Sequence, residues 1–109
     1  MEIKIAPCTI AEREFDGTLT GGRLMLRLVQ YGKFLWEANI ALPDKLPQES
    51  GNPGRRPMRH DNGFYWEWRD DSAFLRIWIY STLRRAEGVN LSIGIEQNGF
   101  VIGRYRLYL

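Results

Sequence analysis

Apolar and polar residues alternate with a period of two along most of this chain, and turn-forming residues separate the alternating runs. Because successive side chains of a β-strand point to opposite faces of a sheet, this pattern predicts strands that are each buried on one face. No long stretch shows the apolar stripe that an amphipathic helix needs. The pattern therefore predicts an all-β protein built mostly of antiparallel hairpins.

The first clear hairpin spans residues 23–42 and turns at Gln30, Tyr31 and Gly32. If Gly32 takes the left-handed position of a three-residue loop, the two strands share one apolar face. That face pairs Leu28 with Phe34, Leu26 with Trp36 and Leu24 with Ala38. The opposite face carries Arg23, Met25, Arg27, Glu37 and Asn39, with Arg27 and Glu37 as diagonal neighbours of opposite charge.

The second hairpin spans residues 63–80 and is expected to turn at Asp70 and Asp71, whose short side chains suit tight turns. Its core face pairs Trp68 with Ala73, Trp66 with Leu75 and Phe64 with Ile77. The other face gathers aromatic and charged residues: Tyr65, Phe74, Trp78 and Tyr80, with Glu67, Arg69 and Arg76. In this register Tyr65 lies opposite Arg76.

The third hairpin spans residues 89–109 and contains a strong turn signal, Gln97-Asn98-Gly99. A two-residue turn at Asn98 and Gly99 would mix charge into the apolar face, pairing Ile93 with Arg104 and Leu91 with Arg106. A three-residue loop instead pairs Ile95 with Val101, Leu91 with Tyr105 and Val89 with Leu107. The hydrophobic pattern favours the three-residue loop. The outer face then carries Asn90, Ser92, Arg104 and Arg106.

The N-terminal residues give weaker signals. Residues 2–6 fit a strand, and residues 18–20 fit a short one. Between them, Thr9 to Glu12 has the spacing of a capping box, which could open one helical turn before Gly17. The sum is seven or eight strands, which predicts a single domain over residues 1–109 with the architecture of an antiparallel β-sandwich or a flattened barrel.

Residues 43–62 break the alternation and are expected to form one long surface loop. They contain four of the five prolines of the chain and almost no apolar residues, so they cannot form a central strand. A basic cluster lies in this segment: Arg55, Arg56, Arg59 and His60. Its side chains could contact phosphate groups, or could simply keep a surface loop solvated.

Composition narrows the classes of function. Fifteen Lys and Arg against thirteen Asp and Glu give a net charge of only +2, which by itself does not indicate a polyanionic partner. Cys8 is the one cysteine, so no intramolecular disulfide can form and a reducing compartment fits best. No secretory signal or membrane-spanning run is found in these residues, so we expect a cytoplasmic protein that does not bind membranes.

Residues with catalytic chemistry are sparse. His60 is the one histidine, Cys8 lies beside Pro7 outside any nucleophile motif, and no glycine-rich phosphate loop is present. Asp70 and Asp71 are adjacent carboxylates, but a solvated hairpin tip encloses no substrate. We therefore expect no catalytic residues, no cofactor and no metal site.

The aromatic outer face of the second hairpin is the strongest candidate for a binding surface. Aromatic side chains beside Arg76 can stack on bases or sugars, anchor a protein interface, or lie buried under other strands or a second subunit. The preferred hypothesis is a non-catalytic interaction module that binds a protein partner or forms a homo-oligomer. The alternative is an OB-like nucleic-acid-binding protein that uses Arg76, Arg104 and Arg106 beside Trp78 and Tyr80.

Overall fold

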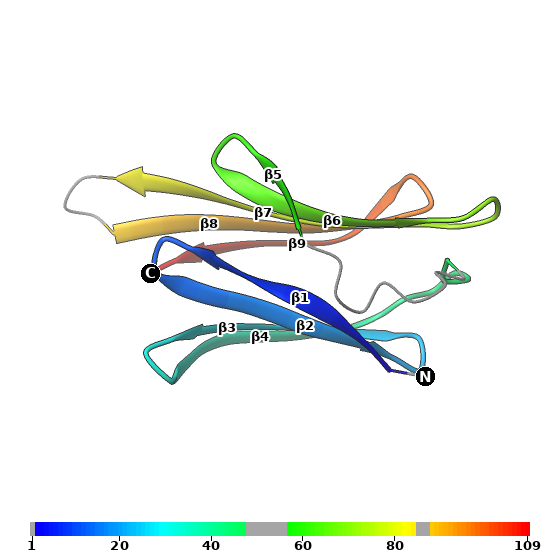
Figure 1. The fold of residues 1–109 in the computed structure, drawn as a ribbon, viewed down its shortest axis with the longest axis horizontal. Helices are drawn as coiled ribbons and strands as arrows, with labels where there is room; N and C mark the ends of the chain where they lie inside the picture. The colour runs from blue at the N-terminus through cyan, green and yellow to red at the C-terminus, as the bar shows by residue number, and fades with distance from the viewer. Residues whose placement is uncertain (1, 48–56, 85–87) are drawn as a thin grey trace.

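Two antiparallel sheets stack to form a β-sandwich in the computed structural model, which describes residues 2–47, 57–84 and 88–109 (Figure 1). The first sheet contains β1 (Glu2–Ile10), β2 (Arg13–Thr20), β3 (Arg23–Gln30) and β4 (Lys33–Ala41). The second contains β5 (Met58–His60), β6 (Gly63–Arg69), β7 (Phe74–Arg84), β8 (Gly88–Gln97) and β9 (Phe100–Tyr108). Strand order follows chain order in both sheets, so the fold is two consecutive meanders.

The predicted all-β class is confirmed, but the described residues form nine strands rather than seven or eight. One strand of this larger number, β5, lies inside the segment predicted to be a loop. Across residues 2–47, 57–84 and 88–109 the chain forms no helix, and hence none that could span a membrane.

The N-terminal residues form a complete hairpin, so the helical turn that the capping-box spacing could open after Thr9 does not form. Ala11 and Glu12 adopt left-handed φ angles of 49° and 64° and connect Ile10 directly to Arg13. Cys8 and Ile10 are both buried, as a period-two strand requires. Burial of these alternate side chains outweighs the local capping signal.

The hairpin of β3 and β4 has a two-residue turn, and the predicted register is wrong by two residues. Tyr31 and Gly32 have φ angles of 50° and 73°, and a bulge at Leu35 then shifts the ladder. As a result Leu28 lies opposite Trp36 and Leu26 opposite Ala38. Phe34 precedes the bulge and is 55% exposed instead of joining the core.

The hairpin of β8 and β9 also combines a two-residue turn with a bulge, and both registers considered from the sequence are wrong. Asn98 and Gly99 form a two-residue turn, and a bulge at Ile102 follows. Leu91 therefore lies opposite Leu107, and Ile95 opposite Gly103. One inserted residue satisfies both the turn and the hydrophobic pattern, which a bulge-free register cannot do.

The β6–β7 connection is a four-residue loop, not a tight turn at Asp70 and Asp71. Asp70 Oδ1 accepts hydrogen bonds from the backbone N–H groups of Ser72 and Ala73, both at 2.8 Å. The predicted pairings are therefore wrong by two residues: Trp66 lies opposite Ile77, and Tyr65 opposite Trp78. An even shift leaves every side chain on its predicted face.

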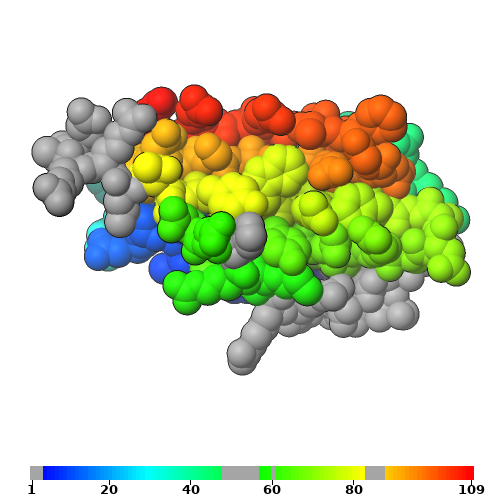
Figure 2. All heavy atoms as spheres, turned by 90° about the horizontal axis from the view of Figure 1, so that it is seen from above, coloured from blue at the N-terminus to red at the C-terminus, as the bar shows by residue number. Residues whose placement is uncertain are grey.

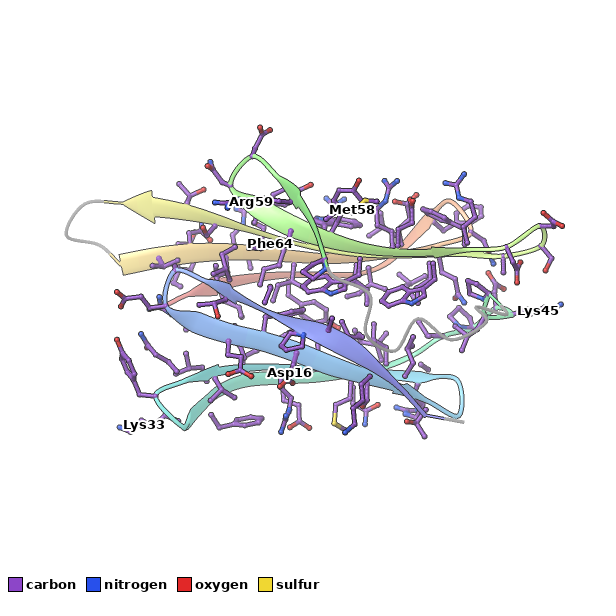
Figure 3. The ribbon with its side chains drawn as sticks, in the orientation of Figure 1. Asp16, Lys33, Lys45, Met58, Arg59 and Phe64 are labelled. Carbon is purple, nitrogen blue, oxygen red and sulfur yellow. The ribbon has the colours of Figure 1, made fainter. Side chains whose placement is uncertain are left out.

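The core lies between the two sheets, where side chains from both fill the space (Figure 3). Trp66 on β6 belongs to it and is 2% exposed. Its ring packs against Phe15 with centroids 5.3 Å apart. Its Nε1–H donates to the backbone oxygen of Ala6 at 2.9 Å. Ala6 and Pro7 form a bulge in β1, so this oxygen, outside the ladder, receives its bond from the opposite sheet.

The predicted long loop, residues 43–62, is confirmed at its start, where residues 43–47 form no strand or helix, and is wrong at its end, where residues 58–60 form β5. At its start, the Asp44 backbone N–H donates to Gln97 Oε1 at 3.3 Å, and Gln97 Nε2 donates back to the Asp44 backbone oxygen at 3.1 Å. Gln97 is fully buried, and Pro47 is buried too. At its end, β5 pairs with β6. Residues 48–56 lie outside the described part of the chain.

Candidate functional site

The outer surface of the five-stranded sheet, here called the aromatic face, carries the predicted binding residues (Figure 2). It exists because β6 and β7 bury alternate residues in the core and turn the others outward. Strand parity and register place these residues on it: Met58, Tyr65, Glu67, Arg69, Phe74, Arg76, Trp78, Tyr80, Ser92, Glu96, Val101, Arg104, Arg106 and Tyr108.

Trp78 lies at the centre of the aromatic face and rests on a glycine. Tyr65, Trp78, Gly94 and Arg104 lie opposite one another in a row across four strands. A Cβ atom added to Gly94 would lie only 1.9 Å from Trp78 Cζ2, so the indole occupies the space that a side chain there would take. The ring is half-buried by its own sheet.

Tyr80 is held in a similar way. A Cβ atom added to Gly63, its partner on β6, would lie 2.6 Å from Tyr80 Cδ1. The two rings are thus supported by neighbouring strands and not by a covering layer. Every other described strand lies in this sheet or in the sheet behind it, so none of them covers the face.

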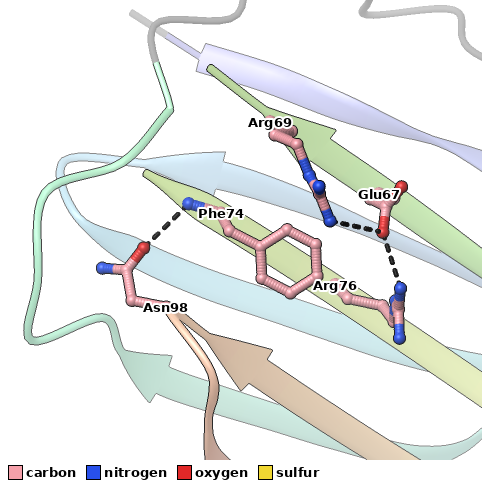
Figure 4. Close-up of polar contacts among 5 residues, drawn as sticks. All are labelled: Glu67, Arg69, Phe74, Arg76 and Asn98. Atoms are coloured by element: carbon pink, nitrogen blue, oxygen red, sulfur yellow. Dashed lines mark hydrogen bonds and ion pairs between the residues drawn. The ribbon is translucent and has the colours of Figure 1, made fainter. Parts of the chain in front are cut away.

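A charged cluster borders Phe74 (Figure 4). Arg76 Nη2 donates to Glu67 Oε1 at 2.7 Å, and Arg69 Nη2 lies 3.7 Å from the same oxygen. The Arg76 guanidinium also lies 5.2 Å from the ring centroid of Phe74 and 5.6 Å from that of Tyr65. The hydrogen bond to Glu67 raises the pKa of Arg76 above its ordinary value.

Two shallow hollows flank Trp78. One, of about 440 Å³, is lined by Tyr65, Arg76, Trp78, Tyr80 and Glu96. The other, of about 500 Å³, is lined by Trp78, Ser92, Ile93, Arg104, Tyr105 and Arg106. We call them the aromatic hollow and the arginine hollow. Trp78 lines both, so the face offers two adjoining subsites of different charge.

Arg104 and Arg106 are exposed neighbours on β9, on the predicted outer face. Arg106 lies opposite Ser92, and Arg104 opposite Gly94. The ion pairs of Asp16 and Glu67 engage Arg27, Arg69 and Arg76, and not these two arginines.

Of the loop candidates, Arg59 does not join the aromatic face. Arg59 lies on β5 beside Phe64, with its guanidinium carbon 6.0 Å from the centroid of that ring. Because Arg59 follows Met58 in the strand, it belongs to the opposite face of the sheet. The backbone of His60 pairs with Gly63. Arg55 and Arg56 lie outside the described residues, so the predicted basic cluster is described only at Arg59.

Three exposed apolar residues of the face are absent from the sequence prediction. Met58, Val101 and Tyr108 are 42%, 49% and 67% exposed. The sequence did not predict Met58 because its strand lies in the proline-rich segment. The turn-forming pair Asp61 and Asn62 before Gly63 is the signal that could have indicated a hairpin there. Val101 was assigned to the core because the bulge after it was not foreseen.

Groups with catalytic potential lie elsewhere. Burial raises the pKa of the Cys8 thiol to about 12, so this thiol stays neutral near pH 7. Asp70 holds its own loop through backbone N–H groups. In the described ranges, no three His, Cys, Asp or Glu side chains come together in a way that could hold a metal ion.

Comparison of the chain with protein-family models, with curated proteins and with solved structures gave no significant match.

Proposed function

We propose that this chain is a non-catalytic binding module that docks a protein partner on the aromatic face. One observation carries the proposal: Trp78, Tyr65, Tyr80 and Arg76 line a single hollow on the outer face of a sheet that no other described strand covers. Tryptophan, tyrosine and arginine are the residue types that contribute most binding energy at protein interfaces. Exposed apolar side chains of Met58, Val101 and Tyr108 extend the surface outward.

The aromatic rings are positioned before a partner arrives. Trp78 rests on Gly94 and Tyr80 on Gly63, so little side-chain entropy remains to be lost on binding. The outer face of an antiparallel sheet can be polar, so the fold itself does not require aromatic residues at these positions. Large uncovered apolar patches of this kind mark interaction sites.

The sheet edges are poor alternatives for docking. The edge strands β4 and β9 each carry a bulge, at Leu35 in β4 and at Ile102 in β9. β1 carries a bulge and Pro7, and β5 has only three residues. Bulges, prolines and short edges hinder the addition of a further strand. A partner is therefore expected on the face and not along an edge.

The charge of the face indicates the chemistry of the partner. Among the described side chains, four arginines and two glutamates lie on it, so two copies of the chain docked face to face would bring together two surfaces of the same net positive charge. A different protein with an apolar and acidic surface fits better. Nucleic acid is disfavoured because Arg69 and Arg76 are already engaged by Glu67, and because two stacked meanders are not an OB barrel.

The test compares pull-downs from native extract by wild-type chain, Trp78→Ala and the control Met25→Ala, which lies on the outer face of the other sheet. A bound protein is then purified, and its dissociation constant is measured with each variant. We expect Trp78→Ala to weaken binding by at least about 30-fold, which is about 2 kcal/mol, and Met25→Ala to leave it unchanged.

Three results would refute the proposal. Binding that disappears on nuclease treatment would assign the face to nucleic acid. A concentration-dependent dimer disrupted by Trp78→Ala would assign it to a second copy of the chain. Equal weakening by the two variants would show that the aromatic face is not the docking surface.

A further inference from the structure

We infer that the aromatic face recognises a bipartite segment of the partner, with an apolar side chain in the aromatic hollow and an aspartate or glutamate in the arginine hollow. This inference rests on the proposed function and adds the chemistry of the recognised segment. The two hollows share Trp78 as a common wall, so a single segment can fill both.

The two hollows differ in charge compensation. In the aromatic hollow, Arg76 is hydrogen-bonded to Glu67, and Glu96 lies in the wall itself. Three aromatic side chains line this hollow, which therefore suits an apolar group. No acidic residue lines the arginine hollow, where Arg104 and Arg106 stand beside the hydroxyl-bearing Ser92.

The arginine hollow suits a carboxylate. Guanidinium groups bind carboxylates through paired N–H donors, and the Ser92 hydroxyl adds a further donor at the same place. Both arginines are exposed and form no ion pair with a carboxylate of the described residues. A carboxylate of the partner would thus meet two guanidinium groups, neither of which is paired with a described carboxylate of this chain.

The sheet geometry sets the spacing of the two groups in the partner. The aromatic hollow is lined from β6, β7 and β8, and the arginine hollow from β7, β8 and β9, so the two are offset by one strand. Adjacent strands lie about 4.8 Å apart, and an extended peptide advances about 3.3 Å per residue and returns to the same side every second residue. The apolar and acidic side chains are therefore expected about two residues apart, in a segment that crosses the strands.

The experiment pans a random peptide library displayed on phage against the immobilised full chain. The same library is panned against Trp78→Ala, against Arg104→Gln with Arg106→Gln, and against the control Arg23→Gln with Lys33→Gln. The control removes the same charge from exposed positions of the other sheet. Circular dichroism checks that each variant folds.

Wild type is expected to enrich peptides with Asp or Glu about two residues from Leu, Ile, Phe or Trp. The best of these, synthesised and labelled, should lose about tenfold in affinity for the Arg104/Arg106 double variant and keep its affinity for the control. A scrambled peptide of the same composition should bind weakly to all.

Other outcomes overturn the inference in distinguishable ways. Enriched peptides that lack acidic residues, or that bind the arginine double variant equally well, would refute bipartite recognition while leaving Trp78-dependent binding intact. Enrichment on Trp78→Ala equal to that on wild type would refute the proposed function itself. Displacement of the peptide by an oligothymidylate of similar length, with steep salt dependence, would assign the arginine hollow to nucleic acid.

Discussion

The two outer faces of the sandwich obey the same period-two rule but differ in chemistry. On the four-stranded sheet, Arg27 forms a two-point ion pair with Asp16, with distances of 3.0 and 3.1 Å. Arg23 Nε donates to Asn39 Oδ1 at 2.8 Å. These polar groups bind one another. On the five-stranded sheet, rings and arginines take their place, and Arg104 and Arg106 lack such partners among the described carboxylates.

The difference separates what the fold requires from what lies beyond it. Both inner faces are built from buried aliphatic and aromatic residues, as the core demands. The outer face of the four-stranded sheet carries Phe34 and Met25 beside these polar pairs, so this architecture needs no cluster of aromatic rings on an outer face. The aromatic face therefore needs another explanation, and binding is the one that its hollows and charges support.

The largest expected effect compares an inner with an outer tryptophan of the five-stranded sheet. Trp66→Ala removes a fully packed ring and its hydrogen bond to Ala6, so we expect a loss of about 3–5 kcal/mol in the free energy of unfolding. Trp78→Ala removes a half-buried ring and should cost only about 1–2 kcal/mol. Urea unfolding of both variants measures the difference. Similar losses would mean that Trp78 serves the fold and not a partner.

A second comparison uses one glycine from each sheet. A Cβ atom at Gly17 would lie 2.5 Å from the backbone oxygen of Met25, which cannot move away without distorting the sheet, so Gly17→Ala should cost about 2–3 kcal/mol. At Gly94 the obstacle is the Trp78 side chain, which can swing outward. Gly94→Ala should therefore cost only about 1 kcal/mol and shift tryptophan fluorescence to the red.

The effect of Gly94→Ala on partner binding adds a second test of the contact between Trp78 and Gly94. Gly94→Ala should weaken partner binding strongly despite its small effect on stability, because the displaced ring closes the hollows. Unchanged tryptophan fluorescence together with unchanged binding would show that the contact between Trp78 and Gly94 does not organise the face.

These comparisons also show how far the sequence could predict the molecule. It predicted which side chains face outward on β6 and β7, because an error of two residues in register preserves side-chain parity. It failed where the ladder gains a single residue. The bulges at Leu35 and Ile102 depend on the competition between turn chemistry and core packing, which no local pattern reveals. The strand at Met58 was missed because its pairing depends on a neighbouring strand and not on its own alternation.

The glycines of the site illustrate a second limit. Gly94 interrupts an alternating run, and sequence alone gives its position only as a weak point in a strand. Its role depends on the ring that arrives from the adjacent strand, and therefore on the register. The hollows on either side of Trp78 depend on the same register, so they could not be derived before the pairing was known.

A third prediction checks that the inner face of the four-stranded sheet is dry, as the contrast between inner and outer faces requires. Burial raises the pKa of Cys8 from 9.0 to about 12 in the folded chain. The unfolded thiol ionises first as the pH rises, so stability is fully present below pH 9 and falls between pH 9 and 12, by about 1.4 kcal/mol per pH unit at most.

The measurement is the free energy of unfolding of wild type and Cys8→Ala at several pH values from neutral upward. Because tyrosines and lysines titrate in both proteins, the difference between the two curves isolates the thiol. A difference that does not change with pH, or rapid reaction of the native thiol with a disulfide reagent, would show that water reaches this face.

The smallest expected effect on stability compares the acidic residue at the centre of each outer face. Asp16→Asn removes the partner of Arg27, and Glu67→Gln removes the partner shared by Arg69 and Arg76. Each pair is partly exposed, so each variant should lose no more than about 1 kcal/mol in the free energy of unfolding. Stability alone would thus leave the two faces indistinguishable, and association kinetics are needed to separate them.

Association with an acidic partner should respond to one of these changes and not to the other. Glu67→Gln frees two guanidinium groups on the docking surface, so its association rate constant should be higher than that of wild type. This rate constant should also decrease more steeply than that of wild type as salt is added. Asp16→Asn gives the chain the same change in net charge on the opposite side of the sandwich, where screening by salt limits its influence. Stopped-flow association at several ionic strengths measures both. If the two variants accelerate association equally, net charge and not the local field of the aromatic face attracts the partner, and the contrast between the two outer faces loses its functional meaning.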